Sequence, residues 1–186
     1  MSKTTLQQSE APARHNQPIG LLSAQRLLAV GVAASLAVDA YVHVHDAGFY
    51  DLVRSNVLSE ATLFRVQAAI AVAAAVVVLI WPRPLSWAAS LTVAGTAFSA
   101  VMVYTYVRIG ALGPLPNMFE PTWALPGKLV SAWAEGAGTA ASLVGLVLAV
   151  RHRESLSSRT GDATSDSSVD EVLSAARSER RSNHEG

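Results

Sequence analysis

The sequence predicts an all-α fold, a transmembrane up-down four-helix bundle with disordered tails. Four apolar stretches are each close to the roughly 20 residues that an α-helix needs to cross a bilayer. Of the 186 residues, 51% are hydrophobic and only 15% are charged, whereas soluble domains average about 25% charged. The charges are also unevenly spread, because they gather in the terminal segments and leave long apolar runs between them.

The composition excludes several classes of function. The chain has no cysteine, which rules out disulfides, thiolate catalysis and cysteine-ligated metal centres. Its 14 basic and 14 acidic residues cancel, whereas nucleic-acid binding needs a basic surface. No phosphate-binding loop, HExxH, GxSxG or dinucleotide motif is present. These absences favour a non-enzymatic protein without a nucleic-acid partner.

The first half of the chain predicts a tail and two spans. Residues 1–20 are polar and form a disordered N-terminal tail, and residues 21–150 form the transmembrane domain. The first span covers about 27–45, and its length favours an uncleaved helix over a signal peptide. The second span covers about 61–81 and ends at a turn with two prolines, Pro82 and Pro84, which cannot continue a helix.

Two further spans follow. The third covers 85–109, and the connection at 110–127 holds four prolines and three glycines, as expected for a loop. The fourth covers 128–150 and ends at the basic sequence Arg151-His152-Arg153. Residues 151–186 are rich in serine and charge, which predicts a disordered cytoplasmic tail.

The basic residues predict the orientation in the plasma membrane. An even number of spans places both termini on one side, and lysine and arginine favour the cytoplasm. Cytoplasmic termini place seven basic residues near the membrane inside and four outside. The outer four are Arg54, Arg65, Arg108 and Lys128. Trp81 and Trp87 then belong to the inner interface, and Trp123 and Trp133 to the outer one.

Ionisable residues recur at one depth, near the predicted extracytoplasmic end of every span. Asp39 and His43 lie one helical turn apart on one face of the first span. Glu135 lies about 10 Å below the outer end of the fourth span, at about 1.5 Å per residue. The predicted polar cluster comprises Asp39, His43, Glu60, Arg65, Arg108 and Glu135.

Three interpretations of this cluster stay open. In the first, Arg65 or Arg108 pairs with Glu135 or Asp39 in a structural ion pair, because a buried charge without a partner is costly. The second is a transition-metal or haem site, and the third is a path for protons or solutes, since intramembrane carboxylates often mark pathways.

The metal or haem hypothesis uses His43, His45 and Asp39, with Glu135 as a further ligand. Imidazole and carboxylate suit first-row metals. His43 and His45 point about 160° apart on a helix, so joint binding requires the helix to end near residue 43. The path hypothesis uses Asp39, His43 and Glu135 as relay groups.

Small residues recur every four positions in the fourth span, at Ala134, Gly138 and Ser142. Such faces let transmembrane helices approach closely. This face therefore predicts tight packing within the bundle or against a second copy of the chain or another membrane partner.

The segment YVHVHDAGFYDLV, followed by LFRVQAAIAV, resembles uncharacterised small four-helix integral membrane proteins of actinobacteria, which are DoxX-like in layout. The resemblance covers roughly residues 25–150. The matching positions are His43, His45, Tyr50, Phe64, Gln67 and Glu135. It implies a four-helix membrane protein and brings no established activity. The predicted function is a non-enzymatic accessory or interaction protein; the alternative is a small transporter or a metal- or haem-binding redox protein.

Overall fold

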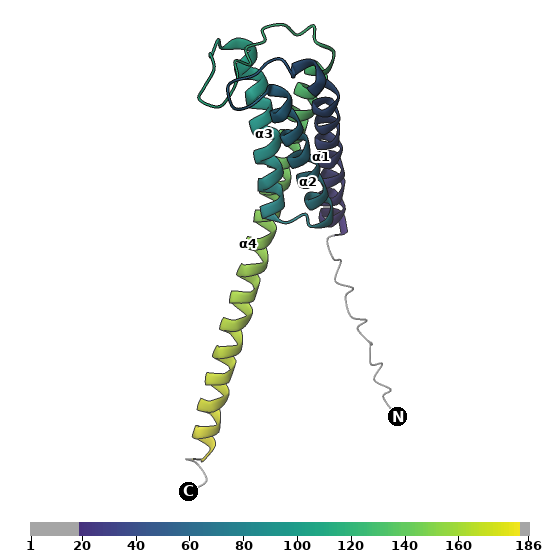
Figure 1. The fold of residues 1–186 in the computed structure, drawn as a ribbon. Helices are drawn as coiled ribbons and strands as arrows, with labels where there is room; N and C mark the ends of the chain where they lie inside the picture. The colour runs from purple at the N-terminus through teal and green to yellow at the C-terminus, as the bar shows by residue number, and fades with distance from the viewer. Residues whose placement is uncertain (1–18, 183–186) are drawn as a thin grey trace, which may run out of the picture.

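The computed structural model describes residues 19–182, which form four α-helices and one short 3-10 helix (Figure 1). The order is α1 (Ile19–Asp46), η1 (Ala47–Tyr50), α2 (Glu60–Ile80), α3 (Pro84–Tyr106) and α4 (Pro126–Ser182). All four α-helices are long and apolar enough to cross a membrane, and no strand occurs in residues 19–182. The predicted all-α four-helix bundle is confirmed.

Local sequence signals set the ends of the middle helices. Ser59 caps α2, because its hydroxyl accepts a hydrogen bond from the amide of Thr62. α2 ends before Pro82, and α3 begins on Pro84, where the missing amide proton costs nothing. α3 ends at Tyr106, three residues before the predicted 109, and the chain then extends into the outer loop.

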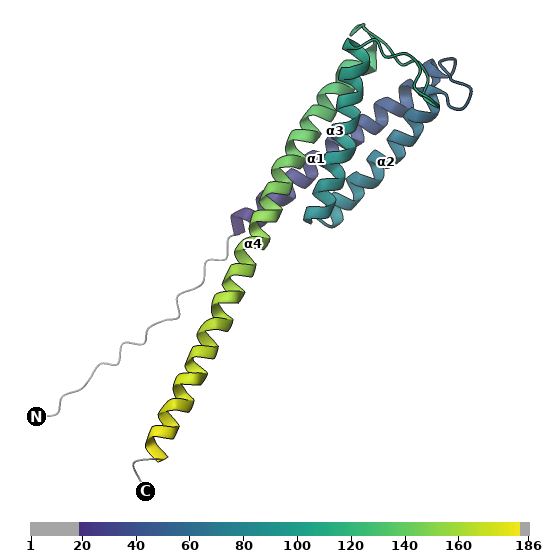
Figure 2. The same cartoon turned by 90° about the vertical axis from the view of Figure 1, so that its left-hand side faces the viewer.

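The C-terminal region differs from the prediction. A disordered tail is predicted from residue 151, whereas α4 continues to Ser182 and projects well beyond the other helices (Figures 1 and 2). No proline follows Pro126, so nothing in the sequence forces a stop. Because the membrane span of α4 is already helical, extending it avoids the cost of nucleating a new helix, and each added residue makes one more backbone hydrogen bond. Of the predicted N-terminal tail, residues 1–18 lie outside the described part of the chain.

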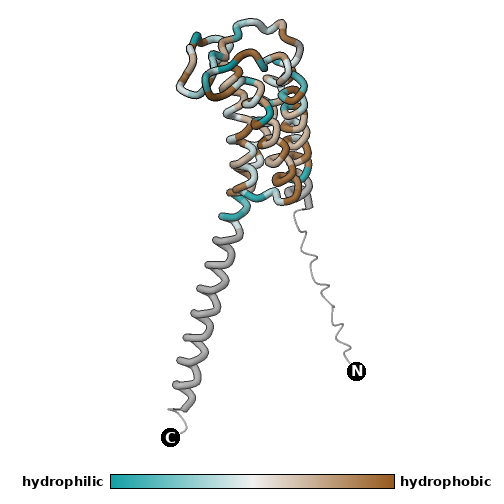
Figure 3. Tube along the Cα trace, viewed as in Figure 1, coloured by the Kyte–Doolittle hydropathy of each residue, from teal (hydrophilic) through white to brown (hydrophobic). Residues whose placement is uncertain are grey.

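The hydropathy of the chain changes along the length of the bundle: hydrophobic residues dominate the middle of the helices, and hydrophilic residues are most frequent at its two ends (Figure 3). The two longer connections, 51–59 and 107–125, lie together at one end, and the 81–83 turn lies at the other, beside the start of α1 (Figure 1). Large apolar side chains such as Leu79 and Leu143 are exposed on the outside, where a bilayer would cover them. We call the end with the longer connections the loop end.

α4 packs between α1 and α3 through small residues. A Cβ on Gly138 would lie 3.2 Å from the Cβ of Ser35 in α1 and 3.5 Å from that of Ala94 in α3. Ser142 is fully buried, but Ala134 is only partly buried. The buried face of α4 therefore includes two of the three predicted small residues, Gly138 and Ser142. Its next small buried residue is Gly145, and Ala134 is not fully part of it.

Trp87 lies in the first turn of α3, at the end of the bundle that the sequence predicts, but its side chain faces inward. A tryptophan near a helix end indicates the membrane interface, but the side chain of Trp87 is fully buried inside the bundle. Its indole packs against the backbone of Gly145, where no side chain occupies the space. Trp81, six residues earlier, is exposed and lies beneath the guanidinium of Arg83, 5.6 Å from the ring centre.

Candidate cation site

Three ionisable side chains meet inside the bundle near the loop end: Asp39 and His43 of α1, and Glu135 of α4. One ligand atom from each lies within 4.8 Å of those from the other two. Asp39 and Glu135 are 0% and 1% exposed, and His43 is partly buried. We call these residues the triad.

Within α1 the triad begins with a helical ion pair. His43 Nδ1 lies 2.8 Å from Asp39 Oδ1 and 3.0 Å from the backbone oxygen of Asp39. This spacing of four residues places both side chains on one face of the helix. The ring of His43 also packs edge-on against Phe64 of α2, with ring centres 4.8 Å apart. No hydrogen bond within residues 19–182 uses the other ring nitrogen, Nε2.

Ser131 and Gln67 connect the two carboxyl groups to the rest of the bundle. The Ser131 hydroxyl lies 2.7 Å from Glu135 Oε1 and 3.2 Å from Asp39 Oδ1. Gln67 Nε2 donates to Asp39 Oδ2 at 3.4 Å. Each oxygen of Asp39 therefore has a partner, and α1, α2 and α4 all hold this one carboxylate in place.

Glu135 retains one oxygen without a partner. Its Oε2 is buried and makes no hydrogen bond within the described part of the chain. A buried oxygen without a partner forfeits a hydrogen bond that water would supply, at a cost of about 1–3 kcal/mol. The triad thus holds an open acceptor, which a bound cation would satisfy.

The predicted arginine pairing does not occur. Arg65 is exposed and lies 3.7 Å from Asp51, which is itself exposed. Arg108 lies over the ring of Phe119 in the outer loop, 5.1 Å from its centre. Neither guanidinium reaches the triad, so the structural ion-pair interpretation lacks its cation.

His45 is also separate from the triad. It is exposed, and its ring stacks on Tyr41 with centres 5.8 Å apart. The reason is helix geometry: α1 continues through residue 46, so His43 and His45 point to nearly opposite sides. The predicted metal set of His43, His45 and Asp39 is therefore corrected to Asp39, His43 and Glu135.

A cavity of about 400 Å³ adjoins the triad, and we call it the loop-end cavity. Its walls come from α1, α2, α3, the outer loop and the start of α4. Its polar and titratable lining residues include His43, Asp46, Tyr50, Glu60, Gln67, Tyr104, Glu120, Lys128 and Ser131. Glu60 thus joins the predicted polar region, although it is not a member of the triad.

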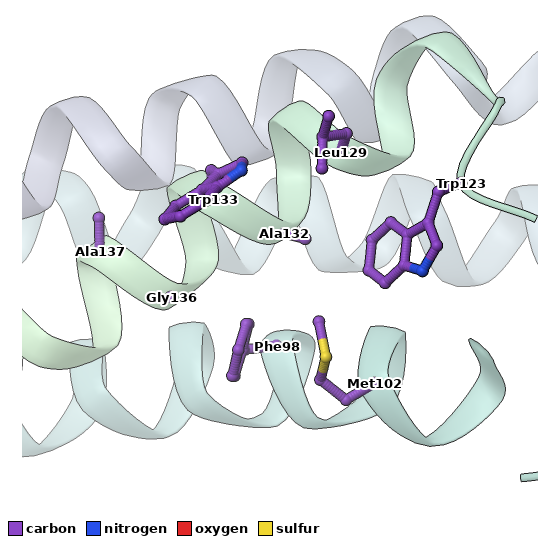
Figure 4. A pocket seen from close by; sticks show the side chains of 8 residues that line it. All are labelled: Phe98, Met102, Trp123, Leu129, Ala132, Trp133, Gly136 and Ala137. Carbon is purple, nitrogen blue, oxygen red and sulfur yellow. The ribbon is translucent and has the colours of Figure 1, made fainter. Parts of the chain in front are cut away.

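A second hollow lies between α3 and α4 and has no charged wall (Figure 4). Its volume is about 480 Å³, and Phe98 and Met102 of α3 face Ala132 and Gly136 of α4 across it. Trp133, at its edge, is 74% exposed. This apolar groove suits a lipid chain and offers no chemistry, so the candidate site is the triad with its cavity.

Sequence reasoning missed Ser131, which links the two carboxyl groups. Its signal is the four-residue spacing to Glu135, the same one-turn relation that Asp39 has to His43. No protein-family model, curated protein or solved structure matches this chain.

Proposed function

We propose that this chain is a non-enzymatic membrane protein that binds a divalent first-row transition-metal ion at the triad, near the loop end of the bundle. The observation that carries this proposal is that one ligand atom from each triad residue lies within 4.8 Å of the other two, beside a buried Glu135 oxygen that has no hydrogen-bond partner in the described residues. Two carboxylates and one imidazole form a mixed oxygen and nitrogen set of the kind that first-row metals accept. A dication would also balance both carboxylates.

The geometry requires the ligand atoms to move together. Metal–ligand bonds of about 2.0–2.2 Å place two ligands of one ion at most about 4.4 Å apart, and about 3.4 Å apart around a tetrahedral ion. The triad atoms lie within 4.8 Å of one another, so the widest separation must close by at most about 1.4 Å to reach tetrahedral spacing. Three protein ligands leave coordination positions open, and the adjoining cavity provides room for water or another ligand there.

The test is metal binding by the purified full chain. We expect one Zn²⁺ per chain by calorimetry and elemental analysis, and Glu135→Gln should weaken binding by about tenfold or more, because it removes one anionic ligand. Asp51→Asn is the matched control, since that carboxylate is exposed and lies outside the triad. Metal-free, colourless wild-type protein that takes up no Zn²⁺ would contradict the proposal, and a Soret band would instead indicate haem.

Transport is a second candidate, favoured by the cavity that adjoins the triad. In this role Asp39, His43 and Glu135 act as relay groups, and flux of metal ions or protons into proteoliposomes should fall in Glu135→Gln. An accessory role is favoured instead by α4, which is 57 residues long and whose C-terminal part extends beyond the bundle, where a partner or a second copy can reach it. The resemblance to DoxX-like four-helix membrane proteins stays a prediction and favours none of these functions over the others.

We further propose that the protein lies in the plasma membrane with both termini in the cytoplasm, which places the triad toward the outside. The chain has no cysteine, so single cysteines report its orientation cleanly. An impermeant maleimide should label Asn117→Cys in the outer loop of intact cells and should label Glu154→Cys only after lysis. The reverse labelling pattern would contradict this orientation.

A further inference from the structure

Glu60, the first residue of α2, is a largely buried residue whose carboxylate accepts no hydrogen bond within residues 19–182. It is only 7% exposed and lines the loop-end cavity. No hydrogen bond or ion pair within residues 19–182 reaches its side chain. The acceptor oxygens of this carboxylate are therefore free to pair with a cation that enters the cavity.

Lys128, the lysine in the cavity wall, acts on Glu60 at a distance, but its hydrogen bonds go to backbone oxygens. Lys128 Nζ donates to the backbone oxygens of Glu120 and Thr122, the latter at 3.0 Å. It also lies over the ring of Trp123, 5.2 Å from its centre. Asp46 adds a further carboxylate to the lining, so negative groups outnumber the single ammonium. The charge of the cavity therefore favours a cation.

The remaining walls indicate what kind of cation. Tyr50, Phe64 and Tyr104 all line the cavity, and the rings of Tyr50 and Phe64 lie 5.0 Å apart. Aromatic faces attract ammonium groups, by about 0.5–2 kcal/mol at each contact. A hydrated metal ion carries a shell of water between its charge and such walls, whereas an organic ammonium can contact both the rings and the carboxylate directly.

The cavity also reaches the outer surface of the bundle. Val66 and Ile70 of α2 line it and are 51% and 47% exposed. Ten residues of helix separate Glu60 from Ile70, or about 15 Å at 1.5 Å per residue. A ligand can thus place its charged end near Glu60 and its apolar end between α2 and α3, toward the bilayer.

We propose that the loop-end cavity binds a lipophilic organic ammonium ion, with the carboxylate of Glu60 as its counter-ion. This site lies beside the triad and does not depend on metal binding there. Glu60 makes the contact with the charge, and the three aromatic rings and the apolar wall receive the body of the ligand.

The test compares a cation with its neutral isostere. Benzyltrimethylammonium and neopentylbenzene have the same shape and differ in charge. Each is titrated calorimetrically into the full chain in uncharged detergent micelles, with empty micelles as the blank. We expect the cation to bind about tenfold more tightly than the neutral compound, and we expect Glu60→Gln to remove that preference. Asp51→Asn should leave it unchanged.

Equal binding of the two compounds, or an unchanged preference in Glu60→Gln, would overturn the proposal. Zn²⁺ binding serves as the folding control where the wild type binds it, and gel filtration serves otherwise. Glu135→Gln should lose metal affinity and keep its preference for ammonium, so failure of one proposal is distinguishable from failure of the other. A Glu60→Gln chain that elutes as aggregate is replaced by Glu60→Asp, whose shorter carboxylate should retain the preference with weaker binding.

Discussion

Asp39→Ala should destabilise the folded chain by about 3–5 kcal/mol, the cost of removing one partner from a buried ion pair. Asp39 is fully buried and receives contacts from His43, Gln67 and Ser131. Removing its carboxylate leaves the Gln67 amide without its acceptor and His43 without its anionic partner, although His43 keeps the backbone oxygen of residue 39 and Ser131 keeps Glu135. The measurement is equilibrium unfolding in mixed micelles, followed by circular dichroism.

A surface pair provides the matched control for this prediction. Asp51 also pairs with a basic residue, Arg65, but both side chains are more than half exposed and lie 3.7 Å apart. Exposed pairs contribute about 0–1 kcal/mol, so Asp51→Ala should change the free energy of unfolding by no more than that. Asp39→Asn should fall between the two variants, because it retains the shape and one acceptor. Equal effects of Asp39→Ala and Asp51→Ala would show that the triad does not stabilise the fold.

The spans and the depth of the polar groups follow from the sequence because a bilayer imposes a single axis on the chain. Run length locates each helix along that axis, and antiparallel order then brings Asp39, His43 and Glu135 to one level. The structure brings these three together, as their shared depth predicts.

Depth does not determine which way a side chain points around its helix. Arg65 and Arg108 share the depth of the triad but lie outside it. Hydrophobicity does not mark the inner face of these helices, because both faces are apolar. Residue size marks it instead: the buried residues of α2 are mostly alanine, and its exposed apolar residues are mostly valine, leucine and isoleucine. The direction of His45 follows from helix geometry once α1 is known to continue through residue 46.

The length of α4 could not be read from composition for a related reason. Polar, serine-rich segments lack the apolar area that pays for ordering. Residues 151–182 are different because they continue an existing helix, which removes the cost of nucleation. How far the helix continues depends on the helix propensities of many residues added together. Each propensity is small, so no single sequence motif marks where the helix ends.

Gly145→Ala should disrupt packing between α3 and α4 and destabilise the chain by about 1–3 kcal/mol, the range for overpacked cores. A Cβ at this position would lie 2.3 Å from Cε3 of Trp87. The indole is rigid and fully buried, so it cannot move aside without displacing its neighbours. Gly31→Ala is the control, because a Cβ there meets nothing within 4 Å, and alanine should stabilise that helix by about 0.5–1 kcal/mol.

The pair Trp87 and Gly145 can be tested as a unit by a double-mutant cycle. Trp87→Phe alone should cost stability, because it leaves a cavity opposite Gly145. Combined with Gly145→Ala, the smaller ring should accommodate the new methyl group, so the double variant should be more stable than the two separate losses predict. Unfolding in mixed micelles measures both losses. Additive losses would mean that the close approach of α4 to Trp87 does not limit the size of residue 145.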